Sequence, residues 1–180
     1  MIRYTNRQGK TYILHRDKRG QHYFSQNVQH FTLRLPAGHE IYEHPNGQVF
    51  LRAKQPPLWE ESEVTLLRQY VDANPAVLDA IIDVRGKVAT IWVSTTETSQ
   101  LSDWKKQGFR NYQDALAFAK LSFQYTPELR FTKEGSNFLV ERYCYRSSVD
   151  DWIGLDRGTL KTMAILFIRH LNQPSLYELV

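Results

Sequence analysis

Histidines at metal-ligand spacing are the first residues of this chain that could do chemistry, and they gather near its start. Five of the 6 histidines lie in the first 55 residues. The segment HEIYEH, from His39 to His44, nearly matches the zinc motif HExxH, whose histidines are four residues apart on one helix face. Here the spacing is five, and Pro45-Asn46-Gly47 follows directly. Residues five apart on a strand point to opposite faces, so we expect a solvated strand here rather than a zinc site.

Three further histidines, His15, His22 and His30, offer a second candidate metal site. His15 and His22 fall on neighbouring strands of a predicted hairpin, where the two rings could face each other. Structural zinc sites use four ligands, and the sequence specifies no complete set. The single cysteine, Cys144, excludes an intrachain disulfide and a cysteine-based metal cluster. It lies on a predicted strand, where a buried, inert thiol is expected. We therefore predict no bound metal and no cofactor.

Carboxylates and a lysine on one hairpin could hold a metal ion for hydrolysis. Asp83 and Lys87 lie at a predicted hairpin, and Asp103 and Lys105 form an Asp-x-Lys in a polar region. Their order does not match the nuclease pattern. Phosphate-binding and nucleophile motifs, namely GxxxxGK[ST], GxGxxG and GxSxG, do not occur in the sequence.

A group of acids near the last predicted helix is another place where a cation could bind. Its members are Glu141, Asp150, Asp151 and Asp156. Such acids more often solvate a loop or complement the positive end of a helix dipole. A metal-dependent hydrolase with a site in the body of the protein stays an alternative. It requires Asp83, Lys87 and the Asp150 group to converge in one pocket.

Positive charge and aromatic rings are concentrated in residues 1–55. This segment has nine Lys/Arg and three acids, a net charge of +6, whereas the other 125 residues have 14 bases and 16 acids. Its aromatic residues are Tyr4, Tyr12, Tyr23, Phe24, Phe31, Tyr42 and Phe50. Small β-sheets bind nucleic acids with aromatic faces and cations. The same rings can instead form the core of a small β module, whose charges then form a solvated surface.

The charge asymmetry indicates a binding or adaptor protein without enzymatic activity, whose basic front contacts an acidic partner. Six cations are the predicted partner-binding residues: Arg16, Lys18, Arg19, Arg34, Arg52 and Lys54. The first three lie at the tip of a predicted hairpin, and the others are expected nearby. Two partner classes stay open, an acidic protein and a nucleic acid bound without sequence preference.

The elements that must position these cations are short strands. Alternating apolar residues between Gly- and Asn-containing turns predict hairpins. The predicted strands span 2–5, 11–16, 21–25, 31–34, 39–43 and 48–52. Asn46-Gly47 favours a type I′ turn, in which both central residues have positive φ. Two consecutive prolines, at positions 56 and 57, predict a boundary between a basic β-hairpin module, 1–55, and a body, 58–180.

The body combines helical and strand patterns. The predicted elements are a helix over 60–73, a hairpin over 80–93, a helix capped by Asn111, a hairpin formed by 129–132 and 138–145, and a helix opening near Thr159. This order predicts an α+β fold, with an antiparallel sheet of about four strands and helices on one face. The repeated α-β-β order could reflect a duplication, although the two halves share no convincing residue identity.

Two segments of the front, Gly9–His15 and Ile41–Arg52, resemble a group of bacterial hypothetical proteins with no assigned activity, and the resemblance extends to Val149–Trp152. It implies a bacterial, cytoplasmic protein, but no site residue or substrate. No apolar run is long enough to span a bilayer, and the N-terminus lacks the apolar core of a signal peptide. With one cysteine, these features favour a reducing compartment, most simply the cytoplasm.

Overall fold

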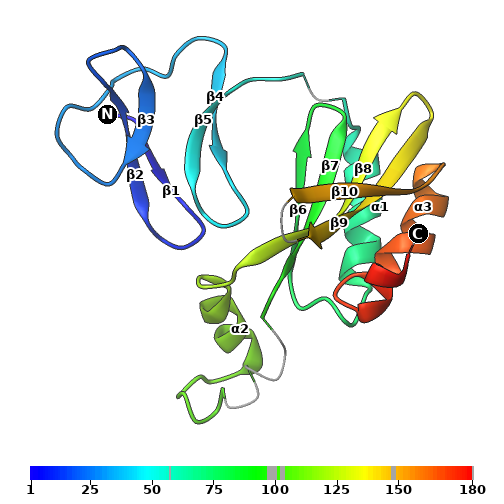
Figure 1. The fold of residues 1–180 in the computed structure, drawn as a ribbon. Coiled ribbons are helices and arrows are strands. Elements are labelled where there is room, and N and C mark those ends of the chain that lie inside the picture. Colours follow the sequence, from blue (N-terminus) through cyan, green and yellow to red (C-terminus); the bar gives the residue numbers. More distant parts are fainter. Residues whose placement is uncertain (57, 97–100, 102–103, 147–148, 180) are drawn as a thin grey trace. The chain divides into compact units, whose positions relative to one another are not determined.

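The computed structural model describes residues 1–180 except 57, 97–100, 102–103, 147–148 and 180, and it leaves the side chains of 146, 149 and 150 undescribed. Contacts divide the chain into two compact units. One comprises Met1–Gln55 and Leu101–Phe123, and the other comprises Pro56–Gln100 and Gln124–Val180. The chain combines helices and antiparallel sheets (Figure 1), which confirms the α+β class. Independent domains over 1–55 and 58–180 stay a prediction.

Residues 1–55, which we call the basic module, contain five short strands in two antiparallel sheets. Strands β1 (Arg3–Thr5), β2 (Thr11–Arg16) and β3 (His22–Ser25) form the first sheet, with β2 in the middle. Strands β4 (His39–Glu43) and β5 (Val49–Ala53) form the second. The predicted hairpins are therefore present, and β2 and β4 have the predicted bounds.

The predicted strand over 31–34 is wrong. Only Phe31 pairs, in an isolated bridge with His15. The preceding residue, His30, has a φ of 58°, and this left-handed conformation interrupts an extended chain. The side chains of Phe31 and Leu33 are 46% and 71% exposed, so no core face stabilises a strand here.

The body sheet has five antiparallel strands, one more than the roughly four predicted. In spatial order they are β10 (Val149–Gly158), β9 (Asn137–Arg146), β8 (Tyr125–Glu134), β7 (Val88–Ser94) and β6 (Ala80–Arg85). The extra strand, β10, lies at an edge and pairs only with β9, with a bulge between Gly154 and Asp156. Edge strands tolerate charged residues and bulges. The run of acids and glycines therefore concealed this strand in the sequence.

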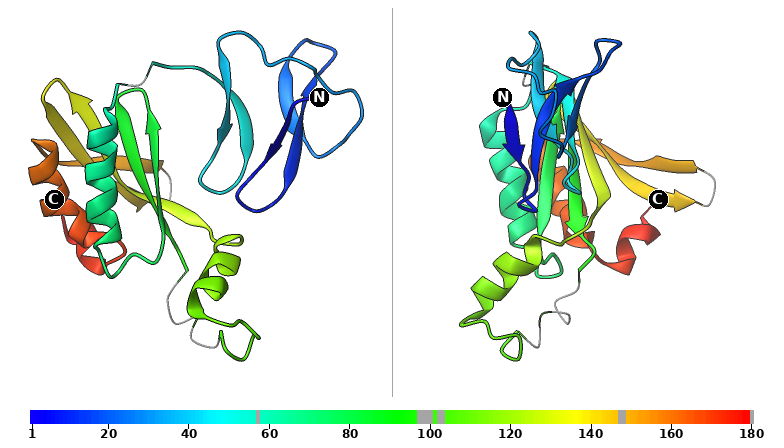
Figure 2. Two further views of the ribbon diagram at one scale, coloured as in Figure 1. Left: turned by 180° about the vertical axis from the view of Figure 1, so that it is seen from behind. Right: turned by 90° about the vertical axis from the view of Figure 1, so that its left-hand side faces the viewer.

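Two helices, α1 (Glu61–Asp72) and α3 (Leu160–Phe167), cover one face of the body sheet (Figure 2). A capping box between Glu60 and Glu63 starts α1, and Thr159, near which the sequence predicts the last helix to open, caps α3. The short helices η2 (Ile168–His170) and η3 (Pro174–Glu178) follow. The core between helices and sheet includes Leu67, Val71, Ile91, Leu129, Phe131, Val140, Met163 and Ile168.

Helix α2 (Tyr112–Lys120) lies in the connection between β7 and β8. Asn111 caps it as predicted, because its side chain accepts a hydrogen bond from the Asp114 N–H. Within the helix only Ala115 is buried, so α2 contributes little to a core. Among the described residues, no helix combines the length and apolar character needed to cross a bilayer.

Candidate interaction surface of the basic module

Three turns of the basic module are built in the same way. Each is a four-residue turn whose last residue is a glycine with positive φ, at Asn6–Gly9, Asp17–Gly20 and His44–Gly47. In each turn, the backbone N–H of the glycine donates a hydrogen bond to the carbonyl of the first residue. The side chain of that first residue accepts a second hydrogen bond, from the backbone N–H of the third residue. Such side-chain acceptors reproduce a backbone turn and fix its shape.

The predicted type I′ turn at Asn46-Gly47 is wrong in its detail. Gly47 has a φ of 82°, but Asn46 is not among the residues with positive φ. Pro45 sets φ near the value that a type I turn requires at its second position. The turn is therefore type I, and Gly47 forms a bulge after it.

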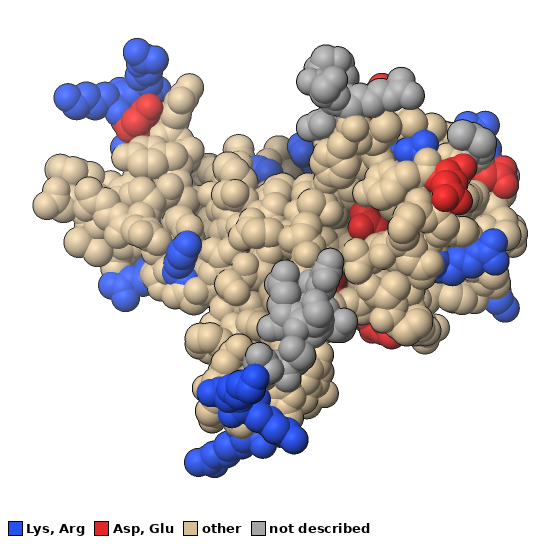
Figure 3. Space-filling model, turned by 60° about the horizontal axis from the view of Figure 1, so that its bottom comes forward, with Lys and Arg blue, Asp and Glu red and all other residues tan. Residues whose placement is uncertain are grey.

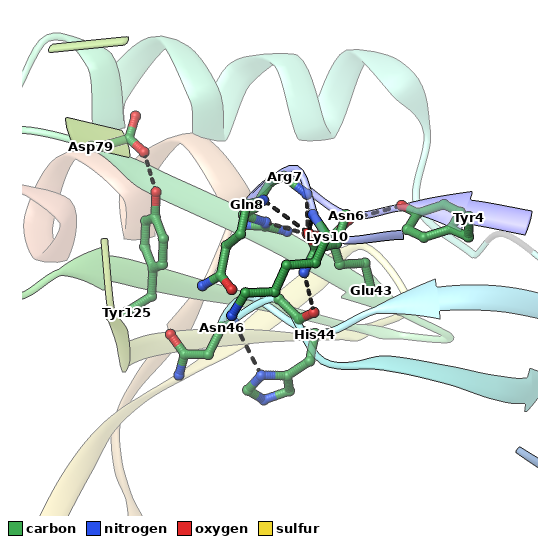
Figure 4. A network of polar contacts seen from close by, with 11 residues as sticks. Tyr4, Asn6, Arg7, Gln8, Lys10, Glu43, His44, Asn46, Asp79 and Tyr125 are labelled. Carbon is green, nitrogen blue, oxygen red and sulfur yellow. Dashed lines mark hydrogen bonds and ion pairs between the residues drawn. The ribbon is translucent and has the colours of Figure 1, made fainter. Parts of the chain in front are cut away.

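Side chains join the β1–β2 turn to the β4–β5 hairpin (Figure 4). The buried Asn6 side chain donates to the Gly47 carbonyl at 2.7 Å. Tyr4 Oη donates to Glu43 Oε2 at 2.9 Å, and Arg7 donates to Glu43 Oε1 from its backbone N–H at 3.0 Å and from Nε at 2.6 Å. The two sheets of the module therefore hold one relative orientation.

The electrostatics of this junction favour an ionised Glu43. Burial alone would raise the pKa of this carboxyl, but hydrogen bonds from Arg7 and Tyr4 outweigh burial and hold the pKa below its ordinary value. The pKa of Tyr4 is raised by burial and by its bond to Glu43. The junction is therefore a charge-assisted network, which is stronger than neutral hydrogen bonds.

The tip of the β2–β3 hairpin presents three of the predicted partner-binding cations. The Asp17 carboxylate accepts from the Arg19 and Gln21 N–H groups, both at 2.8 Å, so this acid stabilises the turn. Arg16, Lys18 and Arg19 are exposed. In the described part of the chain, neither Lys18 nor Arg19 has an ion-pair partner. The turn therefore projects cations toward solvent.

The other three predicted cations lie elsewhere in the module. Arg34 and Lys54 are exposed. Arg52 is partly buried, pairs with Glu40 at 2.7 Å and covers the Tyr42 ring at 4.1 Å from its centroid. In Figure 3 the Lys and Arg side chains on the visible face form separate groups rather than one continuous patch. The exposed cations of the module are thus grouped at the tip of the β2–β3 hairpin. Arg52 instead stabilises the β4–β5 hairpin through its contacts with Glu40 and Tyr42.

The connection between β3 and β4, residues 26–38, exposes apolar side chains that sequence reasoning missed. We call it the apolar loop. It exposes Val28 (66%), Phe31 (46%), Leu33 (71%) and Leu35 (36%). Arg34 lies among them, and the loop contains no acid. Exposure of neighbouring apolar side chains is characteristic of interaction sites, although residue spacing alone could not reveal it.

His15 does not face His22, which corrects the proposed histidine pair. His15 is opposite Tyr23, whereas His22 is opposite Arg16, so the two histidines point to opposite faces. The buried His15 ring stacks on Tyr23 with centroids 5.2 Å apart, and its Nδ1 lies 3.1 Å from the His30 carbonyl. His15 therefore packs within the module.

The other metal candidates do not form a ligand cluster either. His39 Nδ1 lies 3.0 Å from the Ala37 carbonyl, and His44 Nδ1 accepts from the Asn46 N–H. Within the described residues, no three His, Cys, Asp or Glu side chains come together as metal ligands.

The carboxylates considered for a hydrolase lie on different strands of the body sheet. Asp83 is on β6 and Asp151 and Asp156 are on β10, at opposite edges. Four strand spacings separate these edges, or about 19 Å. Glu141 forms a two-pronged ion pair with Arg130. Among the described residues, the required convergence is therefore absent. Asp103 and the Asp150 side chain lie outside the described residues.

A hydroxyl–imidazole contact in the body also lacks catalytic geometry. His170 Nδ1 lies 2.8 Å from Ser175 Oγ, while Arg169 Nε donates to His170 Nε2 at 3.1 Å. The ring proton is therefore on Nδ1 and is donated to the serine, so His170 is not placed to activate this hydroxyl. Burial and the Arg169 charge lower the pKa of His170, which keeps the ring neutral.

Comparisons of this chain with protein-family models, with curated proteins and with solved structures find no match.

Proposed function

We propose that this chain is a binding or adaptor protein without enzymatic activity, whose basic module docks onto an acidic protein. The apolar loop supplies the contact surface, and the cations at the hairpin tip supply the charge. One observation carries the proposal: Leu33 and Val28 are among the most exposed apolar side chains, and Arg34 separates Leu33 from Leu35 in a loop without acids.

The exposed aliphatic side chains favour a protein over a nucleic acid as partner of the basic module. Val28, Leu33 and Leu35 have no ring that could stack on a base, and stacking is what single-stranded nucleic acids offer to apolar residues. Burial of such a side chain against a protein surface contributes roughly 1.5–3 kcal/mol. Partner acids facing Arg16, Lys18 and Arg19 would mainly accelerate association and exclude basic proteins.

A photo-crosslinking amino acid at Leu33 tests this proposal in cells of the source organism. We expect a discrete adduct whose crosslinked peptide, identified by mass spectrometry, comes from an acidic protein segment. Thr65, exposed on α1, is the control position, and it should not give this adduct. Crosslinks to nucleic acid, to a basic segment, or equally from both positions would contradict the proposal.

A further inference from the structure

A second set of cations lies outside the basic module, in residues 104–121, which we call the α2 segment. It carries Lys105, Lys106, Arg110 and Lys120 against a single acid, Asp114. Asp114 lies in the first turn of α2 and accepts a hydrogen bond from the Asn111 side chain at 3.0 Å. On the face drawn in Figure 3, several Lys and Arg side chains gather in one group at the bottom of the view. The segment is therefore strongly cationic.

Aromatic rings accompany these cations. The Phe109 and Phe118 rings are in contact, with centroids 5.5 Å apart and planes tilted by 46°. Phe118 is 64% exposed although it is a large apolar residue. Lys105 Nζ lies 5.5 Å from the Trp104 ring centroid. An ammonium group therefore lies next to the Trp104 ring, and a pair of phenylalanine rings follows along the same short stretch of chain.

We propose that the α2 segment binds single-stranded nucleic acid without sequence preference. Proteins of this kind combine cations that follow the phosphates with aromatic side chains on which bases stack. Phe118 and Trp104 supply ring faces, and Lys105 and Arg110 supply charge. A base of a duplex is already stacked on its neighbours, so exposed rings favour single strands.

The composition of the α2 segment differs from that of the apolar loop. Its most exposed large apolar residue is the aromatic Phe118, at 64%, and the aliphatic Leu121 is 44% exposed. The aromatic side chains thus favour nucleic acid here, whereas three of the four exposed apolar side chains of the apolar loop are aliphatic and favour a protein. This inference concerns a separate segment and does not depend on the function proposed for the basic module.

Fluorescence anisotropy with a labelled 15-nucleotide oligothymidylate at 50 mM salt tests the inference on the full chain. Phe118→Leu preserves apolar packing but removes the ring, and we expect its affinity to fall at least about fivefold. Phe118→Tyr should retain binding. The double variant Lys105→Ala, Arg110→Ala should lower the salt slope by roughly 0.7 for each lost phosphate contact.

Two control variants separate this surface from general charge. Lys161→Ala removes an exposed cation from α3, and the double variant Arg85→Ala, Lys87→Ala removes two exposed cations from the β6–β7 hairpin. Both should bind like the wild type. Absence of binding, equal affinities for the Leu and Tyr variants, loss of binding in either control, or equal competition by polyglutamate would overturn the inference, and the last result would indicate an acidic protein partner instead.

Discussion

The Asn6 side chain donates a hydrogen bond to the carbonyl of Gly47, 41 residues away, at 2.7 Å. The same side chain accepts from the Gln8 and Lys10 N–H groups with its oxygen. Asn6 thus completes its own turn and holds the β4–β5 turn against it. Because Asn6 is only 4% exposed, water cannot replace these partners easily.

Asn6→Ala should destabilise the basic module by about 2–3 kcal/mol, because it leaves buried polar groups without partners. Asn27→Ala is the matched control. Asn27 also accepts from the N–H two positions on, but it is exposed, so its loss should cost no more than about 0.5 kcal/mol. Hydrogen exchange of the β2 amides measures both effects. Equal costs would show that Asn6 does not join the two turns.

Two glycines have similar backbone conformations but different surroundings. Substituting each by alanine therefore distinguishes the cost of backbone strain from the cost of steric conflict. Gly9 and Gly47 have φ values of 74° and 82°. A Cβ at Gly9 would meet nothing within 4 Å, whereas at Gly47 it would lie 2.9 Å from Gln8 Cδ and 3.0 Å from Asn6 Nδ2. Gly9→Ala should cost about 1 kcal/mol for the left-handed conformation alone. Gly47→Ala should cost measurably more by the same hydrogen-exchange assay, and an equal loss would refute close packing of the two turns.

Acid should weaken the basic module through Glu43. Its pKa is lower in the folded than in the unfolded chain, because the hydrogen bonds from Arg7 and Tyr4 outweigh the effect of burial. The contribution of Glu43 is therefore complete above the unfolded pKa of about 4.3 and is lost as the pH falls through the folded value. Glu43→Gln should flatten the acid limb of a stability curve for the module. An unchanged acid limb would contradict this assignment.

The body should respond to pH in the opposite sense through Glu128. Burial raises the pKa of this carboxyl, although a hydrogen bond from the Asn172 N–H partly compensates. The contribution of Glu128 to the free energy of unfolding is therefore most favourable below the pKa that this carboxyl has in the unfolded chain. It is lost as the pH rises through the pKa of Glu128 in the folded chain. Glu128→Gln keeps an acceptor for Asn172 and should remove this dependence. Urea unfolding followed by tryptophan fluorescence reports mainly on the unit that contains Glu128, because Trp59, Trp92 and Trp152 lie in that unit and Trp104 lies in the other. A variant with the wild-type pH dependence would exclude Glu128 as its source.

The local elements of this fold were predictable where sequence pattern and chain geometry agree. The bounds of β2 follow from an apolar segment between two glycine turns, Asn111 acts as the expected helix cap, and α3 begins near Thr159 as expected. Strand β10 was missed because its acids and glycines resemble a loop, and an edge strand needs only one partner. The left-handed His30 had no signal in the sequence.

The candidate site was predictable only in part. Spacing identified the hairpin tip, because a polar turn between two strands must project its side chains. It could not show that Arg52 pairs with Glu40, since that contact depends on strand register. The exposure of Leu33 and Phe118 was likewise hidden, because an apolar residue in a sequence is expected to be buried until packing shows otherwise.

The central claim is that the cations at the hairpin tip and the apolar loop bind the same acidic protein. The most direct measurement is the yield of the Leu33 crosslink in the variant Arg16→Glu, Lys18→Glu, Arg19→Glu. The matched control carries the same charge change on the body, as Arg85→Glu, Lys87→Glu, Lys161→Glu, all exposed residues. We predict that the adduct disappears in the tip variant and persists in the control. An adduct that persists in the tip variant, or that is lost equally in both, would contradict the claim.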